Sequence, residues 1–241
     1  MNHKKDIIIL LTCCVNPAGM SFTKINDENT RIKQYYNAIT YYLNTTDHKI
    51  LIVENTLFNI DPVFLQNERI EYLTFDGNNF DKALGKGYGE ALIIEHALQN
   101  SYFLKNEKAY IIKITGRLCV INLNNLIKDL PVENKNYIMA EMTWKKDKAY
   151  SHFFISNYNF LKSFVERKEN INDSKGMYFE HLLAEQIKDM NKKGFPFLGL
   201  KRTVIIEGIS GSTGKEYTKN YNIIQLLIFK IKNFYLKNFL K

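Results

Sequence analysis

Two cations flank a flexible backbone near the middle of the chain, in Lys113-Ile-Thr115-Gly116-Arg117. The β-branched and aromatic residues before it, Tyr110-Ile-Ile112, are typical of a strand. A glycine lets the backbone approach a ligand closely, and ligands of open α/β sheets lie beyond the carboxyl ends of the strands. The segment therefore indicates an anion site at a strand end; the alternative is a strand that ends in surface charges.

A glycine-containing segment could contribute to the same anion site. Lys86 and Gly87 stand directly before a helix predicted over residues 91–101, and the amino terminus of a helix together with a cation can bind an anion. The glycine spacing does not match the dinucleotide-binding fingerprint, so a polar loop is the alternative.

A second such segment, Gly208-Ile-Ser-Gly-Ser-Thr-Gly-Lys215, lies near the end of the chain. It is not a P-loop, because five residues separate Gly208 from Gly214 and Glu216 stands where that motif needs a hydroxyl. We expect a mobile loop whose backbone donors, with Lys215, cover a bound phosphate.

Two acidic residues lie where a carboxylate could do acid–base chemistry. Glu141 interrupts an apolar strand-like run, where a carboxylate is costly unless a cation pairs with it, so it is either functional or paired. Glu180 begins a helix predicted over residues 177–190 and could face a cleft; the alternative is a surface carboxylate favoured by the helix dipole. The histidines are dispersed and no Gly-x-Ser-x-Gly turn occurs, so we predict neither a metal site nor a serine hydrolase.

Alternating strands and helices must position these residues. The first half contains four predicted strands separated by helices, which indicates βαβ units in a Rossmann-like, nucleotide-binding half. The predicted strands cover 7–11, 49–54, 71–75, the run that ends at Lys113, 137–144, 151–155 and 203–207, and the predicted helices cover 30–43, 91–101, 159–166 and 177–190. The expected fold class is α/β, with a mixed, mostly parallel sheet.

Composition narrows the class of protein. The 241 residues can form one large domain, and the net charge of +8 favours an anionic partner. Three cysteines without disulfide or metal-ligand spacing indicate a reducing compartment. The first apolar run is too short for a signal peptide, and no run is long enough for a transmembrane helix, so we expect a cytoplasmic protein.

The last segment, residues 221–241, carries four lysines and no acidic residue. On a helix, one side would carry Lys230, Asn233, Lys237 and Lys241, and another Ile224, Leu227, Ile228, Ile231 and Tyr235. This pattern predicts a basic amphipathic helix that associates with a membrane surface. The alternative is a terminal helix docked on its own domain.

The order of elements resembles that of GT-A glycosyltransferases, particularly small bacterial transferases of capsule and lipopolysaccharide (O-antigen) biosynthesis. The resemblance covers most of the chain and rests on the strand from Ile7 to Thr12, the Arg31-Ile-Lys-Gln-Tyr35 helix, the strand ending at Glu54-Asn55, Lys86-Gly-Tyr-Gly-Glu90, Lys113 to Arg117, and the loop 208–217. It implies a GT-A-like domain over residues 1–220, with a nucleotide-sugar-binding half (1–130) and an acceptor half (131–220), followed by the membrane-associating helix 221–241.

One departure from that family bears on mechanism. GT-A enzymes usually hold a divalent metal with an Asp-x-Asp motif at the strand end that here carries Lys113 and Arg117. These two side chains cannot bind a metal, but they can stabilise a leaving diphosphate, arginine as a fork and lysine as a point charge. This departure leads to the hypothesis of transfer without a metal or other cofactor, in which Lys86 or Lys215 assists.

Further roles follow from the resemblance. Residues expected to contact the nucleotide-sugar donor are Thr12, Glu54, Asn55, Asp76, Lys86, Gly87, Thr115, Gly116 and Lys215. Glu180 would take the proton from the acceptor hydroxyl, with Glu141 as the reserve candidate. The implied reaction is hexosyl transfer to a lipid-linked saccharide at the inner face of the cytoplasmic membrane; the sugar, the base and retention or inversion stay open.

Other classes of protein remain. A nucleic-acid-binding or nucleic-acid-modifying protein would explain the positive charge and the many aromatic residues, but the sequence contains no recognisable nucleic-acid-binding motif. A membrane scaffold without activity would use the basic tail, yet it leaves the cations, glycines and acids at the strand ends unexplained. The nearest enzyme alternative is a nucleotidyltransferase, which usually needs carboxylate-held magnesium.

Overall fold

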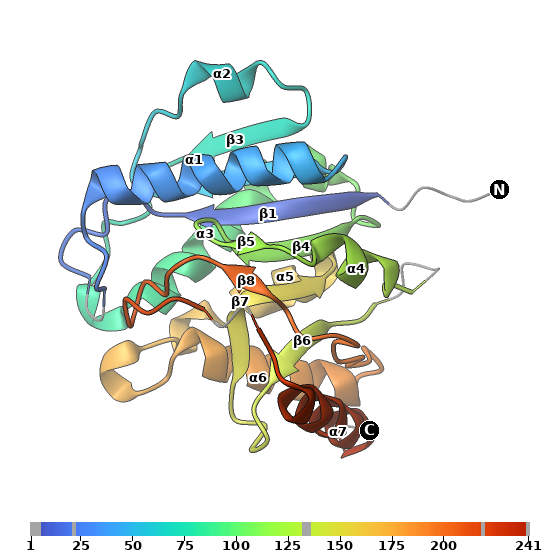
Figure 1. Ribbon diagram of the computed structural model, residues 1–241. Coiled ribbons are helices and arrows are strands. Elements are labelled where there is room, and N and C mark those ends of the chain that lie inside the picture. Colours follow the sequence, from blue (N-terminus) through green and yellow to red (C-terminus); the bar gives the residue numbers. More distant parts are fainter. Residues whose placement is uncertain (1–5, 21–22, 132–135, 218–219, 240–241) are drawn as a thin grey trace.

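A six-stranded sheet in the order β3-β2-β1-β4-β7-β6 forms the centre of the fold (Figure 1). The computed structural model describes residues 6–20, 23–131, 136–217 and 220–239, so Lys241 lies outside the described residues. The strands are β1 (Ile7–Cys13), β2 (Lys49–Glu54), β3 (Ile70–Thr74), β4 (Tyr110–Thr115), β6 (Met139–Met142) and β7 (Ala149–Ser156). The first four are parallel, and β7 is antiparallel to both β4 and β6. The α/β class with a mixed, mostly parallel sheet is confirmed.

Helices cover both faces of the sheet. One face carries α1 (Glu28–Thr45) and α4 (Leu123–Lys128), and the other carries α3 (Lys86–Asn100), α5 (Tyr158–Val165) and α6 (Phe179–Lys192) (Figure 1). Every residue of β1 is buried, and its side chains enter the two cores alternately. Burial on both faces is why β1 is an almost continuous apolar run in the sequence.

Smaller elements complete the fold. The short helix α2 (Pro62–Leu65) follows β2, and β5 (Cys119–Val120) pairs antiparallel with β8 (Ile206–Glu207) in a separate two-stranded sheet. Single 3-10 turns cover Lys82–Leu84, Phe103–Lys105, Lys168–Asn170 and Asp173–Lys175. The strand predicted over 203–207 is therefore reduced to its last two residues.

The prediction that the glycine segment precedes its helix is wrong. Helix α3 begins at Lys86, five residues before the predicted start at 91, and Gly85 is its N-cap with a φ of 86°. A Cβ atom on Gly87 would lie 2.9 Å from the Cβ atom of Phe179. The glycine therefore allows the first turn of α3 to pack closely against the start of α6.

The terminal helix α7 (Ile223–Phe239) docks on the domain through one face. Phe229 and Leu236 are buried, and Lys232 Nζ donates a hydrogen bond to Glu141 Oε1 at 2.6 Å. This pair supplies the cation that a carboxylate within β6 requires, so Glu141 has a structural partner. Within the part of the chain that is described, no helix is both long and apolar enough to cross a membrane.

Candidate active site

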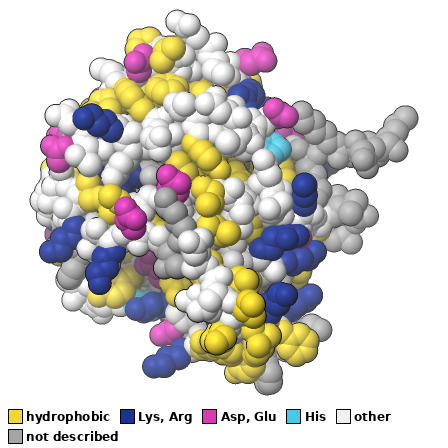
Figure 2. Space-filling model, viewed as in Figure 1, with side chains coloured by type: hydrophobic (Ala, Val, Ile, Leu, Met, Phe, Trp, Pro, Cys, Tyr) yellow, Lys and Arg dark blue, Asp and Glu magenta, His cyan; other side chains and the backbone are white. Residues whose placement is uncertain are grey.

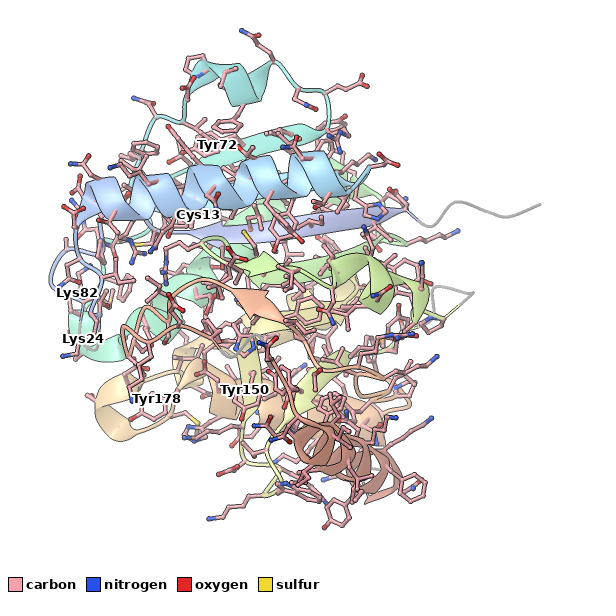
Figure 3. All side chains as sticks on the ribbon, viewed as in Figure 1. Cys13, Lys24, Tyr72, Lys82, Tyr150 and Tyr178 are labelled. Carbon is pink, nitrogen blue, oxygen red and sulfur yellow. The ribbon has the colours of Figure 1, made fainter. Side chains whose placement is uncertain are left out.

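A cavity of about 220 Å³ opens at the carboxyl ends of β1 and β4. Its walls come from these strand ends, the first turn of α3, β7, the start of α6 and the loop after β8. Cys13, Lys24 and Tyr178 lie toward this end of the molecule in Figure 3. The position is the one at which open α/β sheets bind ligands.

The structure brings some of the predicted site residues together and separates others. Those that line the cavity are Thr12, Asn55, Lys86, Gly87, Thr115, Arg117 and Glu180. Those that do not are Glu54, Asp76, Lys113, Gly116 and Lys215.

Lys113 lies beneath the cavity rather than in its wall. Its side chain is fully buried, and its Nζ donates hydrogen bonds to the Glu90 carboxylate and, at 2.5 Å, to the Ser151 carbonyl oxygen. A buried ammonium requires partners of this kind. In this structure Lys113 is therefore an internal ion-pair partner and does not line the cavity.

Glu54 and Gly116, both expected to contact the nucleotide-sugar donor, hold backbone segments in place. The Glu54 carboxylate accepts hydrogen bonds from the backbone N–H groups of Val15 at 3.0 Å, Thr56 at 2.8 Å and Phe58 at 3.0 Å. It thereby fixes the loops after β1 and β2. A Cβ atom on Gly116 would lie 2.4 Å from Cys13 Sγ, so this glycine serves the close approach of β4 to β1. Asp76 and Lys215 are exposed outside the cavity.

Part of the cavity wall carries cations, and the Asp173 carboxylate lies near one of them, Lys86. Arg117 donates hydrogen bonds to Gln34 Oε1 at 3.1 Å and to the Ile209 carbonyl oxygen at 3.3 Å, and a Cβ atom on Gly211 would lie 2.4 Å from its Nη2. Lys86 Nζ donates to Ser212 Oγ in the same loop. Two cations from different elements therefore converge where the loop after β8 crosses the cavity.

The wall also carries the carboxylates of Glu90 and Glu180. Glu90 accepts hydrogen bonds from Thr12 Oγ1 at 3.0 Å and from Lys113 Nζ, and Glu180 Oε1 accepts one from Ser151 Oγ at 2.5 Å. Because Lys113 also binds the Ser151 carbonyl oxygen, this one buried cation connects the supports of both carboxylates. A carboxylate held in this way can accept a proton, or a hydrogen bond from a ligand hydroxyl.

Sequence reasoning missed several polar residues of the wall, among them Glu90, Ser151, His152 and Asp173. One signal was available for Glu90: it follows Lys86 by four residues, and that spacing places both side chains on one face of a helix. Nothing local marked the others. Burial raises the pKa of Asp173, and the nearby Lys86 charge opposes that rise.

A further cation near the cavity is used to hold a loop. Arg31 Nε donates to the Cys14 carbonyl oxygen at 2.7 Å and Nη1 to the Ile25 carbonyl oxygen at 3.1 Å, while Tyr35 Oη donates to Cys14 at 3.0 Å. Burial raises the pKa of Tyr35 to about 12 and that of the Cys14 thiol to about 11. Both groups therefore stay protonated at neutral pH, which excludes Cys14 as a ready thiolate nucleophile.

His152 predicts an acid-dependent loss of stability. Burial, together with the Lys113 charge, lowers its pKa from 6.5 to about 4. As the pH falls through 6.5, the unfolded chain gains this proton and the folded protein does not, so the free energy of unfolding should decrease by about 3 kcal/mol by pH 4. Urea denaturation of the His152→Gln variant at several pH values should lack this contribution.

The neighbouring Tyr150→Phe variant is the control, since it removes no group that titrates between these pH values. An identical decline in stability in wild-type protein and His152→Gln would contradict the assignment.

Within the described ranges, no group of three or more His, Cys, Asp or Glu side chains is arranged to hold a metal ion. After β4, Arg117 lines the cavity and Lys113 lies beneath it, and neither of these cationic side chains coordinates a divalent cation.

Comparisons with known proteins find fold-level similarity only. No protein-family model and no curated protein matches the chain. The glycosyltransferase GlyE of Streptococcus pneumoniae matches with a TM-score of 0.47 and 11% identity over 82% of this chain, which spans 46% of that protein. A proposed nucleotide-diphospho-sugar transferase of Desulfovibrio desulfuricans matches with a TM-score of 0.48 and 10% identity over 82% of this chain and 80% of that one.

A third solved structure, 4-diphosphocytidyl-2C-methyl-D-erythritol synthase, has a TM-score of 0.42 and 10% identity, with 95% of this chain and 99% of that chain covered. Similarity at this level assigns neither a family nor an activity to the protein.

Proposed function

We propose that the protein is a glycosyltransferase that transfers a hexosyl group from a nucleotide sugar to a saccharide acceptor without a metal. One observation carries the proposal: a single cavity at the strand ends is lined both by the cations of Arg117 and Lys86 and by the carboxylates of Glu90 and Glu180. A nucleotide sugar has the matching polarity, with an anionic diphosphate next to a polyhydroxylated ring.

The two cations match the charge of the diphosphate. Arg117 offers a planar fork for phosphate oxygens beside Ile209 and Gly211, and Lys86 adds a point charge at the amino terminus of α3, next to Ser212. As the bond between the anomeric carbon and the diphosphate oxygen breaks, the electron pair leaves with the diphosphate. Fixed cations stabilise the charge that develops there.

The two carboxylates match the hydroxyl groups of the acceptor and of the sugar. Glu180 takes the proton of the acceptor hydroxyl while that oxygen forms the new bond to the anomeric carbon. Ser151 holds the Glu180 carboxylate in place. Glu90, fixed by Thr12 and Lys113, accepts hydrogen bonds from sugar hydroxyls, and Thr12, Asn55 and Thr115 contact the nucleoside part of the donor.

The proposed acceptor is a lipid-linked saccharide of surface polysaccharide (capsule or lipopolysaccharide) biosynthesis, encountered at the inner face of the cytoplasmic membrane. The net charge of +8 supports this location, because basic proteins are attracted to the anionic lipids of that leaflet.

Thermal unfolding with a panel of nucleotide sugars, each with and without EDTA, tests donor binding and metal dependence together. One donor at about a hundred times its Kd should stabilise the protein by about 2.7 kcal/mol, and EDTA should leave that stabilisation unchanged. The Arg117→Met variant should bind this donor about 10 to 100 times more weakly, because it loses a charge-assisted hydrogen bond.

Arg202→Met is the matched control, since Arg202 pairs with Asp129 on the surface, outside the cavity. Stabilisation that disappears in EDTA and returns with manganese would refute metal-independent binding. Stabilisation by DNA and by no nucleotide sugar would favour a nucleic-acid-binding protein instead.

A further inference from the structure

The outward face of α7 is strongly apolar. Ile223 is 84% exposed, Phe234 72% and Leu227 56%, whereas Phe229 and Leu236 on the opposite face are buried against the domain. Figure 2 shows hydrophobic side chains gathered at the end of the molecule where Figure 1 places α7. The helix therefore uses one apolar face for docking and presents a second one outward.

A protein whose surface contacts only water rarely exposes a contiguous apolar face of this kind. The outward side chains share one stripe of the helix, and they are Ile223, Ile224, Leu227, Ile228, Ile231 and Phe234. Contiguous exposed apolar patches on soluble proteins mark sites where a partner or a membrane binds.

The turn between β6 and β7 extends this stripe. Trp144 is 47% exposed, and its ring centroid lies 5.9 Å from that of Tyr235 on α7. Lys146 Nζ lies 4.8 Å from the centroid of the same tyrosine ring, and Lys145 is exposed beside it. We use "α7–turn surface" for the outward apolar side chains of α7 together with Trp144, Lys145 and Lys146.

We infer that the α7–turn surface docks on an anionic lipid bilayer, with α7 lying in the plane of the interface. Charge complementarity selects this occupant: residues 223–239 contain no acidic side chain, Lys230 and Lys237 are exposed along one flank of the stripe, and the turn carries Lys145 and Lys146 against one exposed acid, Asp147. An apolar face flanked by lysines is typical of interfacial helices, and tryptophan concentrates at the headgroup level.

A second copy of the chain fits this surface less well. Two α7 helices packed along their apolar stripes would bring their lysine flanks to the same seam, and α7 offers no carboxylate to pair with them. Anionic headgroups supply that missing partner, at about 1 kcal/mol for each lysine near the surface, which is about fivefold in partitioning.

The surface also connects along the chain to the residues that hold Glu180, and this part rests on the proposed function. From Lys146 in the turn, the chain enters strand β7 at Ala149 and reaches Ser151, which holds Glu180, after five residues. At about 3.3 Å per residue this is a span of at most about 16 Å. A saccharide attached to a membrane lipid would therefore approach Glu180 from the docked side.

Sedimentation of the full chain with vesicles tests the inference. Vesicles of equal parts phosphatidylcholine and phosphatidylglycerol should carry the protein down, and pure phosphatidylcholine should bind it more weakly. The variant Leu227→Gln/Ile231→Gln/Phe234→Gln should lower partitioning at least about tenfold, since apolar burial drives insertion. Lys145→Gln, Lys230→Gln and Lys237→Gln should each lower it about fivefold.

Matched controls come from exposed residues on other elements. Val63→Gln/Leu65→Gln on α2, and Lys33→Gln, Lys108→Gln and Lys128→Gln, should leave partitioning unchanged. Wild-type protein that does not sediment with the anionic vesicles would overturn the inference. A concentration-dependent dimer that the apolar triple variant dissociates, without vesicle binding, would overturn it in favour of a second copy.

A donor measurement separates this inference from the proposed function. The apolar triple variant should keep its stabilisation by a nucleotide sugar, because none of its substitutions lines the cavity. Donor binding without vesicle binding would refute the docking surface alone, and vesicle binding without donor binding would refute the proposed function alone.

Discussion

Replacing Lys113 by methionine should lower the free energy of unfolding by about 3–5 kcal/mol. The substitution removes the cation beneath the cavity, leaves the Glu90 carboxylate without its partner and deprives the Ser151 carbonyl oxygen of a donor. Urea denaturation of the purified variant measures the loss. Adding Glu90→Gln should recover part of it, because the uncompensated charge is then gone.

The control for this prediction is Lys49→Met, which breaks the exposed pair between Lys49 and Asp6. Exposed pairs contribute less than about 1 kcal/mol. A Lys113→Met protein that is as stable as wild type yet fails to bind a nucleotide sugar would contradict the ion-pair role. That outcome would favour direct contact between Lys113 and the diphosphate.

Replacing Glu180 by glutamine should reduce turnover about 100-fold to 10,000-fold while donor binding persists. The amide keeps the shape and can still accept a hydrogen bond from Ser151, but it cannot take the proton of an acceptor hydroxyl. Once a donor has been identified by thermal unfolding, single-turnover sugar transfer by Glu180→Gln measures the chemical step.

Glu185→Gln on the same helix is the matched control, since Glu185 pairs with Arg167 outside the cavity. Near-normal transfer by Glu180→Gln would remove Glu180 from the proposed mechanism. Glu90 is then the carboxylate to test next, because the reserve candidate Glu141 is paired with Lys232 and lies outside the cavity.

The sequence determined the sheet because the relevant signals are local. Strand β1 is almost wholly apolar, β2 is apolar between Lys49 and Glu54, and β4 is apolar apart from Lys113 and Thr115; parallel strands buried on both faces favour such runs. The acidic N-cap Asp27, whose side chain accepts a hydrogen bond from Thr30 N, and the turn residues after β3 likewise act within a few residues. Strand ends also indicated where a ligand would bind, and Thr12, Asn55, Thr115 and Arg117 do line the cavity.

The tertiary structure decided which charged groups remain accessible there. Lys113 and Arg117 are four residues apart at one strand end, yet packing buries the first against Glu90 and leaves the second at the cavity. Glu54 ends the apolar strand β2 and Glu90 follows the glycines of α3, yet only Glu90 lines the cavity. Pattern and spacing record the type of a side chain, whereas its partner comes from a segment tens of residues away, brought near only when the core closes. For that reason the sequence determined at which strand ends the charged residues gather. Only the tertiary structure decided which of them pair internally and which line the cavity.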